Sequence, residues 1–207
     1  MGKLISGVGI NDADYLTQLN ETFVSPSGEL RQRVLWRCPY YTKWTDMIRR
    51  CYSEKELLKR PTYKDCTVCE EWLRFSNFRS WMEAQDWEGK HLDKDLLDYG
   101  NKLYSPETCR FIPPLVNKFI KESRETRGKL PIGVCWHERD GKFVSQCSNP
   151  FNGKREFLGY FSTPEDAHLA WLKRKLILAT EISLQLDDKD VARALINRYE
   201  NYAELRY

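Results

Sequence analysis

The sequence predicts an α+β fold built from two successive units. A β-hairpin that runs into a helix is predicted over residues 90–127, and three short strands followed by an amphipathic helix are predicted after residue 131. The GKLP stretch at 128–131 separates the two patterns with Gly and Pro. Because 41% of the 207 residues are apolar and 13% are aromatic, the chain can form a packed core.

Residues 1–38 show no strong periodicity and are interpreted as a strand-like N-terminal extension. The SPSGE stretch at 25–29 is typical of a turn between two short strands, TFV and RVLW. The next segment predicts a helix, because apolar side chains follow a helical spacing at Trp44, Met47, Ile48, Cys51 and Tyr52. A short helical piece ends before Pro61, an extended TYKDCTVC stretch follows, and residues 70–86 are predicted to form another helix.

Residues 90–113 favour extended structure and turns. The stretches HLDKDLL, DYGNK and YSPETCRFIP are typical of a β-hairpin with an enlarged loop that contains Gly100. Pro113 and Pro114 prevent the second strand from continuing, and a polar, basic helix is predicted over 115–127.

The second unit is predicted to be a small three-stranded antiparallel sheet packed on an α-helix. Its strands are IGVCWHE, KFVSQCS and REFLGYF, and the turns RDG and NPFNG join them. Thr163 as N-cap, followed by Pro164 and Asp166, is a strong helix start. Arg174 interrupts a stripe on that helix that is otherwise suited to burial: Ala167, Ala170, Trp171 and Leu178. A last amphipathic helix is predicted at about 187–203.

Charge is distributed unevenly along the chain. The formal net charge is only +3, but residues 111–160 hold nine Lys or Arg against five acidic residues, a local excess of four positive charges. The first thirty residues hold one Lys against four acidic residues. A basic middle beside an acidic start suggests one face suited to a polyanion.

No apolar run approaches the length of a membrane span, and the start of the chain does not have the pattern of a secretory leader. Seven cysteines, an odd number, fit a reducing compartment better than a disulfide scaffold. The protein is therefore expected to be cytoplasmic and to have no membrane partner.

The predicted hairpin and helix could form a metal site for phosphodiester hydrolysis. An Asp at the end of the first strand can hold a hard divalent cation on the scissile phosphate while a neighbouring base activates water. The run from about Pro39 to Asn117 resembles phage-encoded HNH endonucleases of the homing type, in CPYYTKWTDMIRRCYS, PTYKDCTVCEEWLRFSNFRSWM and especially LDKDLLDYGNKLYSPETCRFIP. The resemblance implies an HNH-like ββα-metal unit over 39–127, a phage origin, and Mg²⁺ or another divalent cation as cofactor.

Carried over residue by residue, the resemblance places Asp93 on the metal-binding Asp and Lys94 on the general-base His. Thr108 falls on the Asn that often supplies a second metal contact, and Asn117 falls near the helix residue that ends the motif. Asp95 could join the metal shell.

Two of the family's usual side chains are therefore changed. A lysine amine is normally protonated at neutral pH, so Lys94 could act as a base only if burial favoured its neutral form, although it could still stabilise charge on a leaving group. In a strand, His91 and Asp93 point to the same side, which makes His91 the other candidate base. The alternative is a hairpin that survives as a scaffold and cuts nothing.

The cysteines of this region allow two interpretations. Four thiolates could hold a structural Zn²⁺, from the set Cys38, Cys51, Cys66, Cys69 and Cys109. The spacing is not a complete pair of CxxC motifs, however, and Cys51 lies on an apolar helical stripe. Core packing is the favoured interpretation.

Residues 132–175 resemble the plant ethylene-response-factor (APETALA2-like) DNA-binding domain. The matching features are Gly133-Val134, Gly141-Lys142-Phe143, Asn149-Pro150, Leu158-Gly159-x-Phe161 and Glu165-Asp166-Ala167. The resemblance implies that residues 128–207 form a DNA-binding domain whose sheet lies in the major groove of double-stranded DNA. Its outward positions would be Cys135, His137, Gln146, Ser148, Arg155 and Phe157.

The favoured function is a metal-dependent HNH-type endonuclease acting on double-stranded DNA. Candidate DNA contacts are Lys118, Lys121, Arg124, Arg127, Arg139, Lys142, Gln146, Lys154 and Arg155. Two other functions stay open. One is a catalytically inactive DNA-binding protein that acts as a regulator or counter-defence factor, and the other is an inhibitor that binds a host or phage protein.

Overall fold

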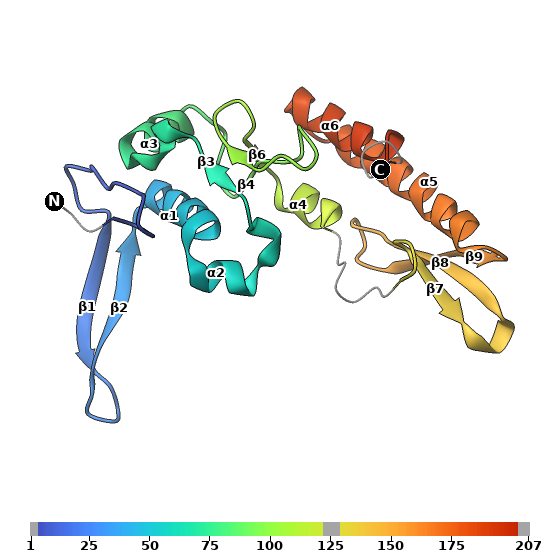
Figure 1. Cartoon of the computed structure of the whole chain (residues 1–207), viewed down its shortest axis with the longest axis horizontal. Coiled ribbons are helices and arrows are strands. Elements are labelled where there is room, and N and C mark those ends of the chain that lie inside the picture. The colour runs from blue at the N-terminus through green and yellow to red at the C-terminus, as the bar shows by residue number, and fades with distance from the viewer. Residues whose placement is uncertain (1–3, 122–128, 203–207) are drawn as a thin grey trace. The chain divides into compact units, whose positions relative to one another are not determined.

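The computed structural model describes residues 4–121 and 129–202 (Figure 1). Its contacts divide the chain into two compact units, Met1–Phe111 and Ile112–Tyr207. Both units combine helices with small sheets, so the predicted mixture of α and β structure is confirmed. The sequence predicts a boundary at 128–131, whereas the contacts place it before the helix that follows the Asp93 region.

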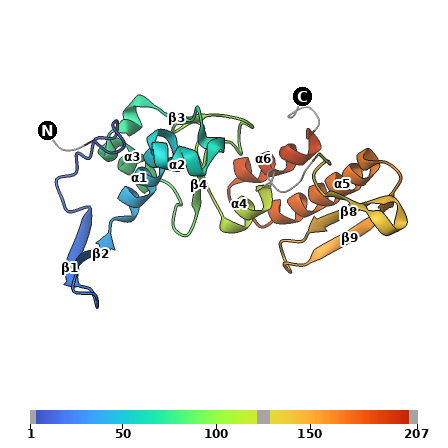
Figure 2. The same ribbon diagram turned by 60° about the horizontal axis from the view of Figure 1, so that its bottom comes forward.

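The first unit begins with a β-hairpin of strands β1 (Gln18–Val24) and β2 (Leu30–Arg37), which pair antiparallel. The turn predicted at 25–29 joins them, with Gly28 at a φ of 82°. Figures 1 and 2 show the hairpin extending away from the helices of its own unit. Its exposed apolar side chains include Val24, Leu30 and Val34.

The core of the first unit forms between helices α1 (Pro39–Tyr52) and α3 (Phe75–Glu83). The stripe predicted on α1 is buried at Trp44, Met47, Ile48 and Cys51, and Tyr52 is half-buried. The Trp44 indole N–H donates to the carbonyl of Trp72 at 2.7 Å, so this large ring is buried without losing its hydrogen bond. The short helix α2 (Glu54–Lys59) and the single 3-10 turn η1 (Pro61–Tyr63) follow α1.

The helix predicted over 70–86 is wrong as one continuous element. A 3-10 turn, η2 (Glu70–Leu73), comes first, and Arg74 is extended before α3 begins. The cause is the N-terminal segment, because the Ile10 N–H donates to Leu73 and the Ile10 carbonyl accepts from Phe75. These two bonds use backbone groups that a continuous helix would need for itself.

The predicted Asp93 hairpin is also more complex than expected. Strand β4 (His91–Asp93) pairs with β6 (Arg110–Ile112), but the loop between them contributes β5 (Leu103–Tyr104) to a parallel pair with β3 (Thr67–Val68). In the second unit, α4 (Pro114–Ile120) begins after Pro113 as predicted. The predicted continuation to residue 127 lies mostly outside the described residues.

The second unit is a three-stranded antiparallel sheet in the order β7 (Val134–His137), β8 (Lys142–Ser148) and β9 (Arg155–Phe161), as predicted. A 3-10 turn, η3 (Glu138–Asp140), joins β7 to β8. Helix α5 (Pro164–Ser183) packs against the sheet, and α6 (Lys189–Glu200) packs against α5.

The start of α5 is as predicted, because the Thr163 hydroxyl accepts a hydrogen bond from the Asp166 N–H at 3.1 Å. The Arg174 guanidinium, which interrupts the predicted stripe, bonds the Glu156 carboxylate of β9 at 2.6 and 3.0 Å. Gly133 has a φ of 82°, and a Cβ there would lie 2.1 Å from the Trp171 side chain. Glycine therefore allows the chain to enter β7 directly against α5.

Within residues 4–121 and 129–202, no helix is both long enough and apolar enough to cross a membrane.

Candidate functional site

Asp93 stands where β4 ends, and its carboxylate organises the turn that follows. One oxygen, Oδ1, accepts the backbone N–H groups of Asp95 at 3.0 Å and Leu96 at 2.8 Å. Burial raises the pKa of Asp93 to about 6, and the negative charge of Asp95 adds to the rise. The two backbone bonds oppose the rise but do not cancel it.

Lys94 points its amine into the same loop and is only 7% exposed. Its Nζ donates to the carbonyl of Asn101 at 2.6 Å and lies 3.3 Å from the Asp95 carboxylate. The Asn101 amide donates back to the carbonyl of Lys94 at 2.7 Å. Because the amine is a hydrogen-bond donor in a reciprocal loop contact, its geometry is that of a structural clasp and not of a base facing water.

Asp95 adjoins Asp93 in the same turn, whereas the other residues of the predicted metal site come from a separate loop, from α4 and from the start of β4. Thr108 uses its hydroxyl within its own loop, donating to the carbonyl of Leu103 at 2.8 Å. Asn117 lies on α4 in the second unit. His91 is exposed at the start of β4, and it interacts with another group of the protein. Among the described residues, no three His, Cys, Asp or Glu side chains are grouped as a metal site requires.

The five cysteines considered for zinc belong to the core of the first unit. Cys38, Cys51, Cys66 and Cys109 are buried, and Cys69 is half-buried against them. Burial raises the pKa of Cys51 and of Cys109 to about 12. The thiols of Cys51 and Cys109 are therefore protonated at neutral pH, and both side chains pack in this core.

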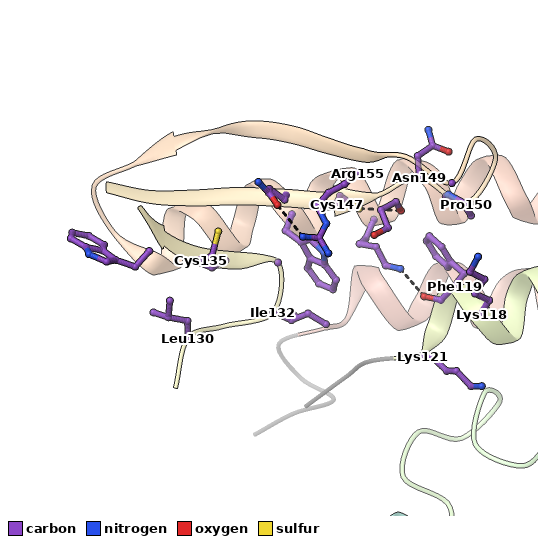
Figure 3. A pocket seen from close by; sticks show the side chains of 18 residues that line it. Lys118, Phe119, Lys121, Leu130, Ile132, Cys135, Cys147, Asn149, Pro150 and Arg155 are labelled. Atoms are coloured by element: carbon purple, nitrogen blue, oxygen red, sulfur yellow. Dashed lines mark hydrogen bonds between the residues drawn. The ribbon is translucent and has the colours of Figure 1, made fainter. Parts of the chain in front are cut away.

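The second unit has an open groove of about 650 Å³ between α4, the sheet and α5 (Figure 3). Four cationic side chains line it, and none of its described lining residues is acidic. Three polar side chains beside these cations can donate or accept hydrogen bonds: Gln146, Ser148 and Asn149. The cations are Lys118, Lys121, Arg155 and Lys175.

Lys175 is a groove residue that the sequence did not single out. It is buried on α5, its Nζ donates to the carbonyl of Phe119 at 2.7 Å, and it lies 3.2 Å from the centroid of the Phe119 ring. The amine thus ties α5 to the end of α4 and brings a positive charge to the groove. Its signal was present in the sequence, because it lies four residues after Trp171, on the stripe predicted to be buried.

The predicted DNA contacts separate into two sets. Lys118, Lys121, Gln146 and Arg155 come together in the groove, where the Arg155 guanidinium lies 3.5 Å from the Gln146 side-chain oxygen. Three others lie elsewhere on the second unit: Arg139, which pairs with Asp140 at 3.0 Å, and the exposed Lys142 and Lys154. Arg124 and Arg127 lie outside the described residues.

The strand register confirms that the predicted outward residues share one face. Gln146 pairs with Phe157, Ser148 pairs with Arg155, and Cys135 pairs with Val144 of the same alternating set. Cys147 and Glu156 occupy the opposite face, toward α5, where Arg174 reaches Glu156.

Comparison with protein-family models, with curated proteins and with solved structures finds no match for this chain. The HNH-like and ethylene-response-factor-like resemblances therefore stay expectations that rest on sequence motifs alone.

Proposed function

We propose that the chain is a double-stranded-DNA-binding protein whose second unit holds the phosphate backbone in the groove through Lys118, Lys121 and Arg155, with the buried Lys175 adding positive charge behind them. The observation that carries this proposal is the charge of the groove, which has four cationic side chains and no described acidic one. Phosphate contacts from Lys and Arg supply most of the sequence-independent affinity for DNA. Gln146 adds an amide that can bond a base edge.

In this proposal the HNH-like ββα unit of the first half is a scaffold and not a cutting centre. The Lys94 amine is buried and donates its hydrogen bond to the Asn101 carbonyl, and the Thr108 hydroxyl donates to the Leu103 carbonyl. A hydrolytic site needs a base within reach of water and a cation held by several oxygens. The protein would then act through DNA binding, as a regulator or counter-defence factor.

A metal-dependent endonuclease is the second candidate, and the pKa of Asp93 favours it. A carboxylate whose pKa is raised to about 6 by burial and by Asp95 would gain from a bound divalent cation, which relieves the repulsion between the two acids. Both backbone bonds fall on Oδ1, and no hydrogen bond from residues 4–121 and 129–202 is made to Oδ2, which could face such a cation. Asp93 and Asp95 would hold the Mg²⁺, and His91 would serve as base.

Incubation with supercoiled plasmid and Mg²⁺ or Mn²⁺ separates the two candidates, with Asp93→Asn as the matched variant. The binding function predicts plasmid that is retarded in a gel but left intact, equally for wild type and variant. Cleavage by the wild type that Asp93→Asn abolishes would establish the endonuclease instead. If the plasmid is neither retarded nor cut at low salt, both DNA functions fail and a protein partner becomes the better proposal.

A further inference from the structure

The outer face of the β7–β9 sheet carries an exposed aromatic ring directly beside the basic groove. Phe157 is 56% exposed, although it lies in the middle of β9. Its cross-strand partner is Gln146, and Arg155 lies two residues earlier on the same face. Both neighbours line the groove. The exposed ring of Phe157 therefore lies beside a side-chain amide and a guanidinium on one face of the sheet.

Tyr160 closes one side of the ring and is held in place. The centroids of Phe157 and Tyr160 are 5.1 Å apart, and those of Tyr160 and His137 are 5.7 Å apart. The Tyr160 hydroxyl bonds the Asp140 carboxylate, which raises the pKa of Tyr160. Phe157 therefore contacts the ring of Tyr160, while another part of its own ring stays open to solvent.

The chemistry around Phe157 selects a nucleobase over a purely apolar partner. A planar base offers a face that can stack on the ring, an edge that can bond the Gln146 amide, and an attached phosphate that can bind Arg155. A strand of phosphates leading from that base would next meet the cations of the groove, Lys118 and Lys121. An apolar peptide would leave these charges without partners.

We infer that Phe157 is a stacking platform for an unpaired base, either extruded from a duplex or presented by a single-stranded segment, and that the groove beside it holds the phosphates next to that base. This inference rests on the proposed DNA-binding function and names its ligand more closely. In a continuous duplex both faces of each base are covered by its neighbours, so stacking on a protein ring requires a single strand or an extruded base.

Fluorescence anisotropy of labelled oligonucleotides tests the inference with three probes: a twelve-nucleotide thymidine strand, an abasic strand of equal length, and a duplex. The variant is Phe157→Ala, and its matched control is Phe151→Ala. Phe151 is also exposed, at 44%, but it lies in the turn between β8 and β9 and not on the sheet face. Phe157→Trp keeps an aromatic platform and provides the rescue variant. Circular dichroism confirms that each variant is folded.

We expect Phe157→Ala to weaken binding of the thymidine strand about tenfold, and to change binding of the abasic strand and the duplex less than twofold. Phe151→Ala should bind all three probes as the wild type does. Phe157→Trp should bind the thymidine strand about as tightly as the wild type and more tightly than Phe157→Ala. Equal loss for all probes, no loss for any, or the same loss in Phe151→Ala would overturn the stacking platform while leaving the groove intact. If the wild type binds none of the three probes, the DNA-binding function itself fails.

Discussion

The loop after β4 and the groove of the second unit both concentrate charged side chains, but they use them in opposite ways. In the loop, the Lys94 amine bonds a carbonyl of its own loop and Asp93 bonds two backbone N–H groups. In the groove, Lys118, Lys121 and Arg155 are exposed and face space that no described acid shares. A charged motif predicts chemistry only when its atoms are not already committed to the fold.

Reversing charge in the groove is the strongest test of this contrast. The double variant Lys118→Glu with Lys121→Glu should weaken duplex binding about a hundredfold at 0.1 M salt, because two phosphate contacts are lost and two repulsions are added. Titration by fluorescence anisotropy measures the effect. The control is Lys55→Glu with Lys64→Glu, which makes the same change in net charge at exposed residues of the first unit. Equal losses in the two double variants would mean that net charge matters and the groove does not.

Removing the Lys94 amine, which bonds Asn101 across the loop, should affect stability and not DNA binding. Lys94→Ala leaves the part-buried carbonyl of Asn101 without its charged donor, so we expect the free energy of unfolding to fall by about 2 kcal/mol. Urea denaturation measures this change. Lys102→Ala is the control, because the Lys102 amine also bonds a carbonyl, that of Thr62 at 3.1 Å, but is exposed to solvent. It should cost less than about 0.5 kcal/mol. An unaltered free energy of unfolding in Lys94→Ala would contradict the structural role of the amine.

The pH dependence of stability should show the raised pKa of Asp93. Its pKa is raised to about 6 in the folded state, so the folded protein binds this proton more tightly than the unfolded chain does. Folding stability is therefore expected to increase as pH falls from about 7 toward 4, by about 1–2 kcal/mol from this residue. Comparing urea denaturation of wild type and Asp93→Asn across this range isolates the contribution. Identical pH profiles for the two proteins would contradict a raised pKa at Asp93.

Glu156 should give a smaller effect with the opposite sign. The Arg174 guanidinium and the Asn149 amide lower the pKa of Glu156 to about 2. Its contribution is complete above the ordinary carboxyl pKa near 4.5 and is lost as pH falls through about 2. Because both partners are partly exposed, Glu156→Gln should cost no more than about 1 kcal/mol at pH 7. Thermal unfolding at pH 7 and pH 2 measures it, and an equal cost at the two values would contradict the ion pair.

Local patterns predicted much of the fold. Helix α1 follows from the spacing of Trp44, Met47 and Ile48, and the start of α5 follows from Thr163 and Asp166, because these signals act within a few residues. The break at Arg74 could not be predicted in this way. It depends on Ile10, more than sixty residues away in the sequence, taking the backbone bonds of Leu73 and Phe75.

The candidate site divides in the same way. The excess of basic residues in 111–160 indicated a polyanion surface, and four of the predicted contacts do meet in one groove. Side-chain commitments were not visible in the sequence, because they depend on folded geometry. The backbone carbonyl of Asn101 accepts a hydrogen bond from the Lys94 amine across the loop. The backbone carbonyl of Phe119, on α4, accepts one from the Lys175 amine on α5.

The salt dependence of duplex binding tests the central claim most directly. For wild type and Lys121→Ala, the logarithm of the association constant would be plotted against the logarithm of salt concentration. The groove predicts a steep negative slope for the wild type, and a slope shallower by about 0.9 for Lys121→Ala, the value for one lost phosphate contact. A slope near zero in the wild type, or equal slopes for the two proteins, would contradict DNA binding through this groove.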